Sequence, residues 1–214
     1  SNLLTILLGQ DGFDYGFQVD YKKIWDDEIN AIKEIAEHDK ECLVSIEYKP
    51  NEPRAYSLLS NLGTTLLAIK DINLKNIGVT IDFAHILYSN EQPALVAALI
   101  DKHSQILGLH LNDGYGKRDD GLMVGSVHQL ATIELLYHIT KSKYQGPIYF
   151  DTFPNITNLD PIKECQTNIQ TVKQILKVVE ILLGNNNLSE SMKNQDPITA
   201  QEIFYKTLSK INEK

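Results

Sequence analysis

The chain has 214 residues, 43% of them hydrophobic, and its 28 acidic and 20 basic residues give a formal net charge of −8. This composition indicates a globular protein with a sizeable core and excludes a disordered chain. The acidic balance, without any block of Lys or Arg, argues against a nucleic-acid partner. No apolar run reaches the roughly 18 residues of a membrane span, and the first residues carry no basic leader.

The two cysteines, Cys42 and Cys165, lie far apart in the sequence and in no metal-type spacing. Such spacing favours free thiols in a reducing compartment. We therefore expect a cytoplasmic protein without a membrane partner.

Short apolar runs alternate with helical patterns along the whole chain. The apolar runs predict strands near residues 3–8, 43–48, 77–82, 106–111 and 147–151. The helical patterns cover residues 21–38, 63–72, 93–103, 126–142, 161–184 and 198–212. A polar linker is predicted between the last two helices.

This alternation predicts an α/β fold in which helices cover a parallel sheet. Because no phosphate-binding glycine motif follows any strand, a (β/α)8 TIM barrel is favoured over a doubly wound nucleotide-binding sheet. A closed barrel needs eight βα units, and this sequence contains five. We expect residues 1–184 to form the carboxyl-terminal part of a barrel, and residues 185–214 to form a linker and a C-terminal helix.

The three remaining units would precede this sequence or come from another chain. Without them, the first and last predicted strands would have exposed edges. The C-terminal helices exceed what barrel closure requires, which favours contacts between subunits in a homo-oligomer.

Four consecutive predicted strands end on side chains that can bind a metal, namely Glu47, Asp82, His110 and Asp151. The carboxyl ends of barrel strands meet at one mouth, where the active sites of this fold lie. Taken singly, each has an ordinary explanation, because an Asp at a strand end often caps the next helix and a lone His is often a core residue. Together, three carboxylates and an imidazole would repel each other unless a cation lay between them. We therefore predict a divalent metal, with Mn²⁺ favoured and Mg²⁺, Co²⁺ or Zn²⁺ as alternatives.

A second group of ionisable residues follows the third and fourth strands. His85 comes three residues after Asp82, and the segment HLNDGYGKRDDGL at residues 110–122 adds Asp113, Asp119 and Asp120 in a glycine-rich loop. This group could hold a second metal, or the loop could be a solvated charged turn. The other histidines, His38, His103, His128 and His138, fall within or at the ends of predicted helices and are read as surface or packing residues.

Lys49 lies two residues beyond Glu47 and shares its face of the strand. A lysine that points inward needs a negative charge or a substrate oxygen nearby. Its presence beside the carboxylates indicates a role in the chemistry, and a structural ion pair with Glu47 or Asp82 is the alternative.

The segments SIEYKPNEPR, TIDFAH, LHLNDGYGKRDDGL and YFDTFP, in this order and spacing, resemble the xylose isomerase-like barrel superfamily, and most closely its L-rhamnose isomerase-type sugar isomerases. The resemblance runs from about residue 3 to the carboxyl terminus. It implies a metal-dependent aldose–ketose isomerase that acts on an open-chain sugar by moving hydrogen between C1 and C2.

Carried over to this sequence, the resemblance implies that Glu47, Asp82, His110 and Asp151 bind a structural metal, that His85 and Asp119 bind a second, catalytic metal, and that Lys49 contacts a substrate oxygen. Gly121 stands where related enzymes have a further loop carboxylate, which weakens the second site.

Three alternatives remain open. A sugar epimerase of the same superfamily would use Glu47 and Asp151 as a proton-transfer pair on opposite sides of one carbon. A DNA-repair endonuclease relative shares the Asp-x-x-His turn, but the net charge of −8 argues against it. The chain could also be an inactive or assembly-dependent barrel fragment.

Overall fold

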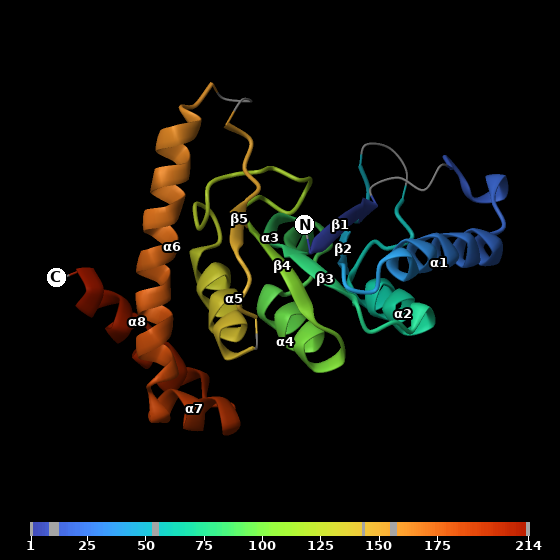
Figure 1. The fold of residues 1–214 in the computed structure, drawn as a ribbon. Helices are drawn as coiled ribbons and strands as arrows, with labels where there is room; N and C mark the ends of the chain where they lie inside the picture. Colours follow the sequence, from blue (N-terminus) through green and yellow to red (C-terminus); the bar gives the residue numbers. More distant parts are fainter. Residues whose placement is uncertain (1, 9–12, 53–55, 143, 155–157, 213–214) are drawn as a thin grey trace.

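The computed structural model has one five-stranded sheet in which every pair of neighbouring strands is parallel and the strand order is β1-β2-β3-β4-β5 (Figure 1). The strands are β1 (Leu3–Leu8), β2 (Leu43–Tyr48), β3 (Ile77–Asp82), β4 (Ile106–Leu111) and β5 (Ile148–Phe150). The five predicted strands are thus confirmed, and the last is shorter than predicted. A sheet whose order follows the sequence is what successive βα units of a (β/α)8 barrel produce.

The structure describes residues 2–8, 13–52, 56–142, 144–154 and 158–212. Within these ranges the helices are α1 (Tyr21–His38), α2 (Leu62–Ile72), α3 (Phe83–Tyr88), α4 (Pro93–His103), α5 (Gln129–Lys141), α6 (Pro161–Leu183), α7 (Asn186–Lys193), α8 (Pro197–Asn212) and a 3₁₀ turn, η1 (Gly16–Gln18). None of them is both long and apolar enough to cross a membrane.

The larger helices cover the sheet in chain order (Figure 1). Helix α1 packs against α2, and α5 packs between α4 and α6. Two groups of buried apolar side chains lie between helices and sheet, one around β2 with α1 and α2, and one around β3 and β4 with α4, α5 and α6. The helix layer therefore fixes the strands and, through them, the positions of the residues at the strand ends.

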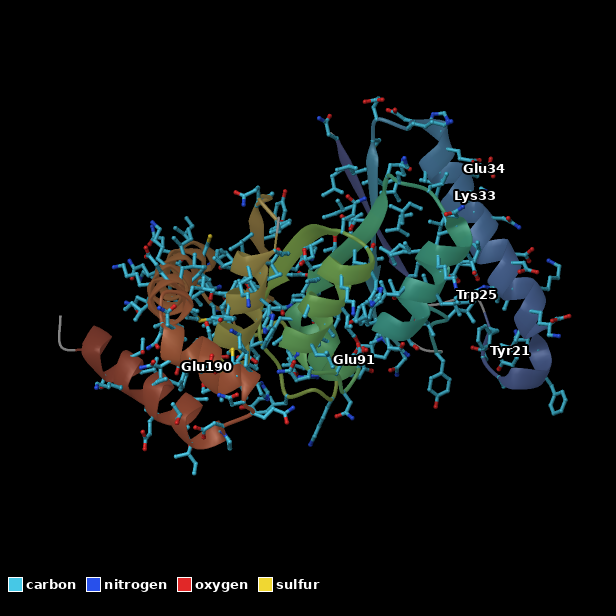
Figure 2. The ribbon with its side chains drawn as sticks, turned by 90° about the horizontal axis from the view of Figure 1, so that it is seen from below. Tyr21, Trp25, Lys33, Glu34, Glu91 and Glu190 are labelled. Atoms are coloured by element: carbon cyan, nitrogen blue, oxygen red, sulfur yellow. The ribbon has the colours of Figure 1, made fainter. Side chains whose placement is uncertain are left out.

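Capping side chains fix where these helices begin. Asp20 accepts hydrogen bonds from two backbone N–H groups at the start of α1, and Asn61 forms a reciprocal capping box with Thr64 at the start of α2. The Trp25 indole N–H of α1 donates to Asp71 of α2 over 3.1 Å, and Figure 2 shows Trp25 beside α2. The first two helices are thus joined by a polar contact as well as by apolar packing.

Two short helices were not predicted. Helix α3 starts directly after β3, because the Asp82 side chain accepts a hydrogen bond from the His85 N–H; six residues are too few for a periodic apolar signal. Helix α7 lies in the segment predicted as a linker, so that prediction was wrong. Asn185 caps α7 and the buried Leu188 anchors it, although most of its residues are polar.

The two outer strands have free edges, as predicted. Among the described residues neither β1 nor β5 pairs with a sixth strand. Leu4 and Leu7 of β1 and Tyr149 of β5 are exposed. Both cysteines, Cys42 and Cys165, are free.

Candidate metal centre

Glu47, Asp82, His110 and Asp151 meet at the carboxyl ends of the four strands β2 to β5. Each offers one ligand atom, and these four atoms all lie within 4.8 Å of one another. Elsewhere in the described ranges, no group of three or more His, Cys, Asp or Glu side chains is gathered in this way.

Strand register explains why side chains so distant in sequence come together. Asp82 of β3 pairs with His110 of β4, and His110 pairs with Tyr149 of β5. Side chains at alternate positions share a face of the sheet, so Asp151, two residues after Tyr149, falls on the same side. The parallel sheet therefore places these ligand-bearing residues at one rim.

The imidazole of His110 lies at the centre of the group. Its Nδ1 is 3.3 Å from Glu47 Oε1, to which it donates a hydrogen bond, and 3.9 Å from both Asp82 Oδ2 and Asp151 Oδ2. The ring packs edge-on against Tyr149, with centroids 5.7 Å apart. The orientation of His110 is therefore set by contacts on two sides.

The group has a buried side and an open side. The side chains of Glu47 and Asp82 are 5% and 0% exposed, whereas those of His110 and Asp151 are 21% and 42% exposed. A small molecule would therefore reach the group from the side of Asp151.

The protonation equilibria reflect the crowding of negative charge. Burial raises the pKa of Asp82 to about 6, with the charge of His85 opposing the increase and that of Glu47 adding to it. Burial, followed by the Glu47 charge, raises the pKa of Asp151. Burial lowers the pKa of His110, but the hydrogen bond to Glu47 and the charges of the carboxylates outweigh it and raise the pKa overall. Such mutual repulsion is what a divalent cation would relieve.

The second predicted group gathers beside the first. His85 Nε2 and Lys49 Nζ each lie 3.1 Å from Asp119 Oδ2, and Lys49 Nζ also lies 3.0 Å from Glu52 Oε2. Burial alone would raise the pKa of Asp119, but the hydrogen bonds and charges of His85 and Lys49 outweigh it and lower the pKa. Lys49 thus pairs with Asp119 and Glu52 rather than with Glu47 or Asp82, the partners considered from the sequence.

Two buried atoms of this group have no hydrogen-bond partner among the described residues, namely His85 Nδ1 and Asp119 Oδ1. His85 Nδ1 faces Glu47 Oε1 at 3.5 Å. Unpartnered buried polar atoms beside a cluster of carboxylates fit a place for a cation or a polar ligand.

Two of the predicted loop candidates have structural partners instead. The buried Asp113 accepts hydrogen bonds from three backbone N–H groups, those of Gly114, Val127 and His128. It also accepts one from His128 Nδ1 at 3.0 Å, so Asp113 closes the base of its own loop. Asp120 accepts from the Tyr115 N–H and from Arg118 within the same loop.

Gly121 explains the missing loop carboxylate. Its φ is +56°, and a Cβ there would lie 2.3 Å from Phe153 Cδ2. The Phe153 N–H also donates to the Gly121 carbonyl at 2.9 Å. A side chain at this position would therefore require both a strained backbone and a displaced Phe153.

Asn112 was not identified as a functional residue from the sequence. The structure buries it completely in contact with Asp82, Ala84 and Asp151. Glu52 was also not identified from the sequence. Its position three residues after Lys49 was the signal that could have indicated their ion pair.

A mostly apolar groove of about 720 Å³ lies elsewhere, lined by residues of α4, α5, α7 and α8. Its lining is mostly apolar and includes none of the four gathered residues. We place the candidate site at the strand ends, because three carboxylates and an imidazole converge there, as no other such group does among the described residues.

Comparison with known proteins agrees with this architecture. The model of the family described as "xylose isomerase-like TIM barrel" matches residues 3–175. The uncharacterized protein MJ1311 of Methanocaldococcus jannaschii is 26% identical over 175 residues, which are 81% of this chain and 55% of that protein. The chain thus spans about half the length of this curated relative.

Two solved structures share the fold. A D-tagatose 3-epimerase-like protein superposes with a TM-score of 0.65 at 21% identity, covering 85% of this chain and 64% of its own. The IOLI protein, whose crystal structure is described with a bound zinc atom, gives a TM-score of 0.59 at 14% identity over 81% of this chain and 61% of its own. With a family model matched over most of its length and a parallel sheet of the expected order, the chain belongs to the xylose isomerase-like TIM barrel family.

Proposed function

We propose that this protein is a metal-dependent aldose–ketose isomerase that acts on an open-chain monosaccharide and moves hydrogen between C1 and C2. The observation that carries this proposal is the convergence of Glu47, Asp82, His110 and Asp151 within 4.8 Å at the ends of four strands. Its family supports a sugar-modifying enzyme, since the related structures include an epimerase-like protein.

The residues at this site suit a divalent cation. Three carboxylate oxygens and one imidazole nitrogen form a donor set used by Mn²⁺ and similar ions, and the zinc-bound IOLI structure makes Zn²⁺ a second candidate. When bound, the cation would supply Lewis acidity to the oxygens of the sugar at C1 and C2. A second cation at His85 and Asp119 would have to share Asp119 with the Lys49 ammonium, 3.1 Å away.

The side chains of the protein supply charge, orientation and exclusion of water. The positive charge of Lys49 stabilises the negative charge that develops on the sugar oxygen at C1. Its bonds to Asp119 and Glu52 outweigh burial and raise its pKa, so that it carries this charge at neutral pH. Glu47 and Asp82 are buried, and the low local polarity strengthens every charge interaction near them.

The test is product analysis by NMR after incubation of the metal-loaded protein with a panel of aldoses and ketoses in D₂O. An isomerase converts an aldose into its ketose, and a direct hydrogen shift leaves C1 and C2 free of deuterium. If no sugar of the panel is converted while the protein holds its metal, the proposal is wrong.

A sugar epimerase is the second candidate. The Glu47 and Asp151 carboxylates both approach His110 Nδ1, at 3.3 and 3.9 Å, and could act as a proton-transfer pair. The same experiment separates the two functions, because proton transfer through carboxylates introduces deuterium from the solvent at the inverted carbon.

A further inference from the structure

Asn112 is fully buried, and its side-chain amide joins two residues of the candidate metal centre, Asp82 and Asp151, to the backbone of Ala84. The Nδ2 group donates to the Asp82 carboxylate, 3.2 Å from Oδ1 and 3.1 Å from Oδ2. The same nitrogen donates to the backbone carbonyl of Asp151 at 3.0 Å. The Oδ1 atom accepts a hydrogen bond from the Ala84 N–H at 2.8 Å.

The orientation of this amide is fixed by its partners. A flipped amide would place the Nδ2 donor against the Ala84 N–H and the Oδ1 acceptor against the carboxylate of Asp82 and the carbonyl of Asp151. All three new contacts would be repulsive, so a single arrangement of the amide satisfies all three partner groups.

The Asp82 carboxylate is therefore held from two directions. The His85 N–H donates to its Oδ1 at 3.0 Å from the first turn of α3, and Asn112 donates to both of its oxygens from the end of β4. Since Asn112 also holds the Asp151 carbonyl, it links the ends of β3 and β5. Partners of this kind orient metal ligands and set metal affinity.

We infer that Asn112 is a positioning residue of the metal centre, one that orients Asp82 and sets the distance from Asp82 to Asp151 so that both can bind one cation. This inference rests on the proposed function. Asn112 touches neither the sugar nor the cation and acts through the two aspartates.

The test is titration of the metal-free protein with Co²⁺, followed by calorimetry and by the visible absorption of the ion. Replacing Asn112→Ala should raise the Co²⁺ dissociation constant about 10- to 100-fold, the usual effect of losing an outer partner of a metal ligand. It should also change the Co²⁺ absorption spectrum, because the spectrum reports the geometry of the ligands.

Asn76→Ala is the matched control. Asn76 likewise uses one Nδ2 group to hold two elements, donating at 2.9 Å to the carbonyls of Ala36 and Cys42, but it lies next to the amino-terminal end of β3. It should destabilise the fold without changing Co²⁺ affinity or the spectrum. Equal loss of affinity in both variants would overturn the inference, because the effect would then follow from destabilisation alone.

Two further outcomes decide the matter. An Asn112→Ala protein that is folded and binds Co²⁺ as the wild type does would refute the role of Asn112 and leave the proposed function intact, whereas a wild-type protein that binds no Co²⁺ would refute both. If Asn112→Ala does not fold, the isosteric Asn112→Asp keeps an acceptor for the Ala84 N–H and removes the donor to Asp82. An altered Co²⁺ spectrum in that variant supports the inference, and an unchanged spectrum contradicts it.

Discussion

At the scale of single residues, the four candidate ligands differ in how firmly the fold holds them. Asp82 is buried and accepts hydrogen bonds from both Asn112 and the His85 N–H. Asp151 is the most exposed of the four. Its pKa is raised, mainly by partial burial and then by the negative charge of Glu47. Asp82 is therefore held firmly by the fold, whereas Asp151 is the candidate ligand that can be changed with least damage to the fold.

Replacing Asp151→Asn should have opposite effects on metal binding and on stability. Metal affinity should fall at least about tenfold, since losing even an outer partner of a ligand costs that much. The free energy of unfolding of the metal-free protein should rise by a few tenths of a kcal/mol, because a repelled carboxylate is removed and solvent screens much of its charge. Calorimetric titration and urea denaturation measure the two quantities. The exposed Asp101→Asn is the control, and a fall in both quantities for Asp151→Asn would contradict the assignment.

Lys49 should matter for turnover and not for holding the metal. Its side chain is 13% exposed and bonds to Asp119 and Glu52 rather than to the four gathered residues. Replacing Lys49→Met should lower kcat about 100-fold, which is typical of losing one group that stabilises developing charge. Metal affinity should stay within about threefold. Lys23→Met, which removes an exposed ion pair with Asp27, should change neither, and an unaltered kcat in Lys49→Met would remove Lys49 from the mechanism.

At the scale of elements, the segment between β4 and α5 carries Asp119 and is closed at its base. Asp113 and Leu122 exchange two backbone hydrogen bonds of 2.9 Å, and the buried Asp113 carboxylate holds the segment's other end at Val127 and His128. The position of Asp119 beside His85 and Lys49 therefore depends on Asp113, which lies six residues earlier.

Replacing Asp113→Ala should destabilise the protein by about 3 kcal/mol, because it leaves three buried or partly buried backbone N–H groups without their acceptor. Asp196→Ala is the comparison. Asp196 accepts hydrogen bonds from two backbone N–H groups at the exposed start of α8, so its replacement should lower the free energy of unfolding by only about 1 kcal/mol. Urea denaturation measures both. Equal costs would show that Asp113 does not organise its loop.

Glu91 joins two other elements. Its carboxylate accepts hydrogen bonds from the Tyr48 hydroxyl at the end of β2 and from the Leu62 N–H at the start of α2. Glu91 itself lies just before the start of α4 and is labelled in Figure 2. Burial raises its pKa, although both hydrogen bonds oppose the increase. The folded protein therefore binds the Glu91 proton more tightly than the unfolded chain does.

A raised pKa of an acid gives stability that is complete below the ordinary pKa and is lost as pH rises through the folded value. Glu91→Gln cannot titrate, so its stability relative to the wild type should improve between about pH 4 and about pH 7. Urea denaturation across this range measures the difference, with the exposed Glu37→Gln as control. A constant difference between Glu91→Gln and the wild type would contradict the expected pH dependence.

At the scale of the whole molecule, much of the architecture follows from local sequence. Continuous apolar runs identified all five strands, because strands buried on both faces need apolar residues throughout. The four candidate ligands followed from the same pattern, since parallel strands bring their carboxyl ends to one rim. Their gathering within 4.8 Å needed no further signal in the sequence.

What the sequence did not reveal depends on contacts between distant segments. Asp113 and Asp119 stand in one loop with similar neighbours, and only the folded chain turns Asp113 toward His128 and Asp119 toward His85. Asn112 looks like any polar residue after a strand until its partners on β3 and β5 are known. Helix α7 forms because Leu188 is buried, and its polar sequence gave no sign of this.

Among the described residues, β1 and β5 form the two open edges of the sheet. The known structures that it matches are longer, so this chain covers only about two thirds of the D-tagatose 3-epimerase-like protein. Turnover can be detected only when the right sugar is supplied, whereas binding of a cation requires only the four residues at the strand ends. Metal binding is therefore the more direct measurement.

Titration of the metal-free protein with Mn²⁺, in the wild type and in His110→Ala, tests the central claim most directly. The account predicts a tight Mn²⁺ site in the wild type that His110→Ala removes, with the fold of the variant unchanged by circular dichroism. A wild-type protein that binds no Mn²⁺, or a variant that binds it equally well, would contradict the claim that Glu47, Asp82, His110 and Asp151 form a metal centre.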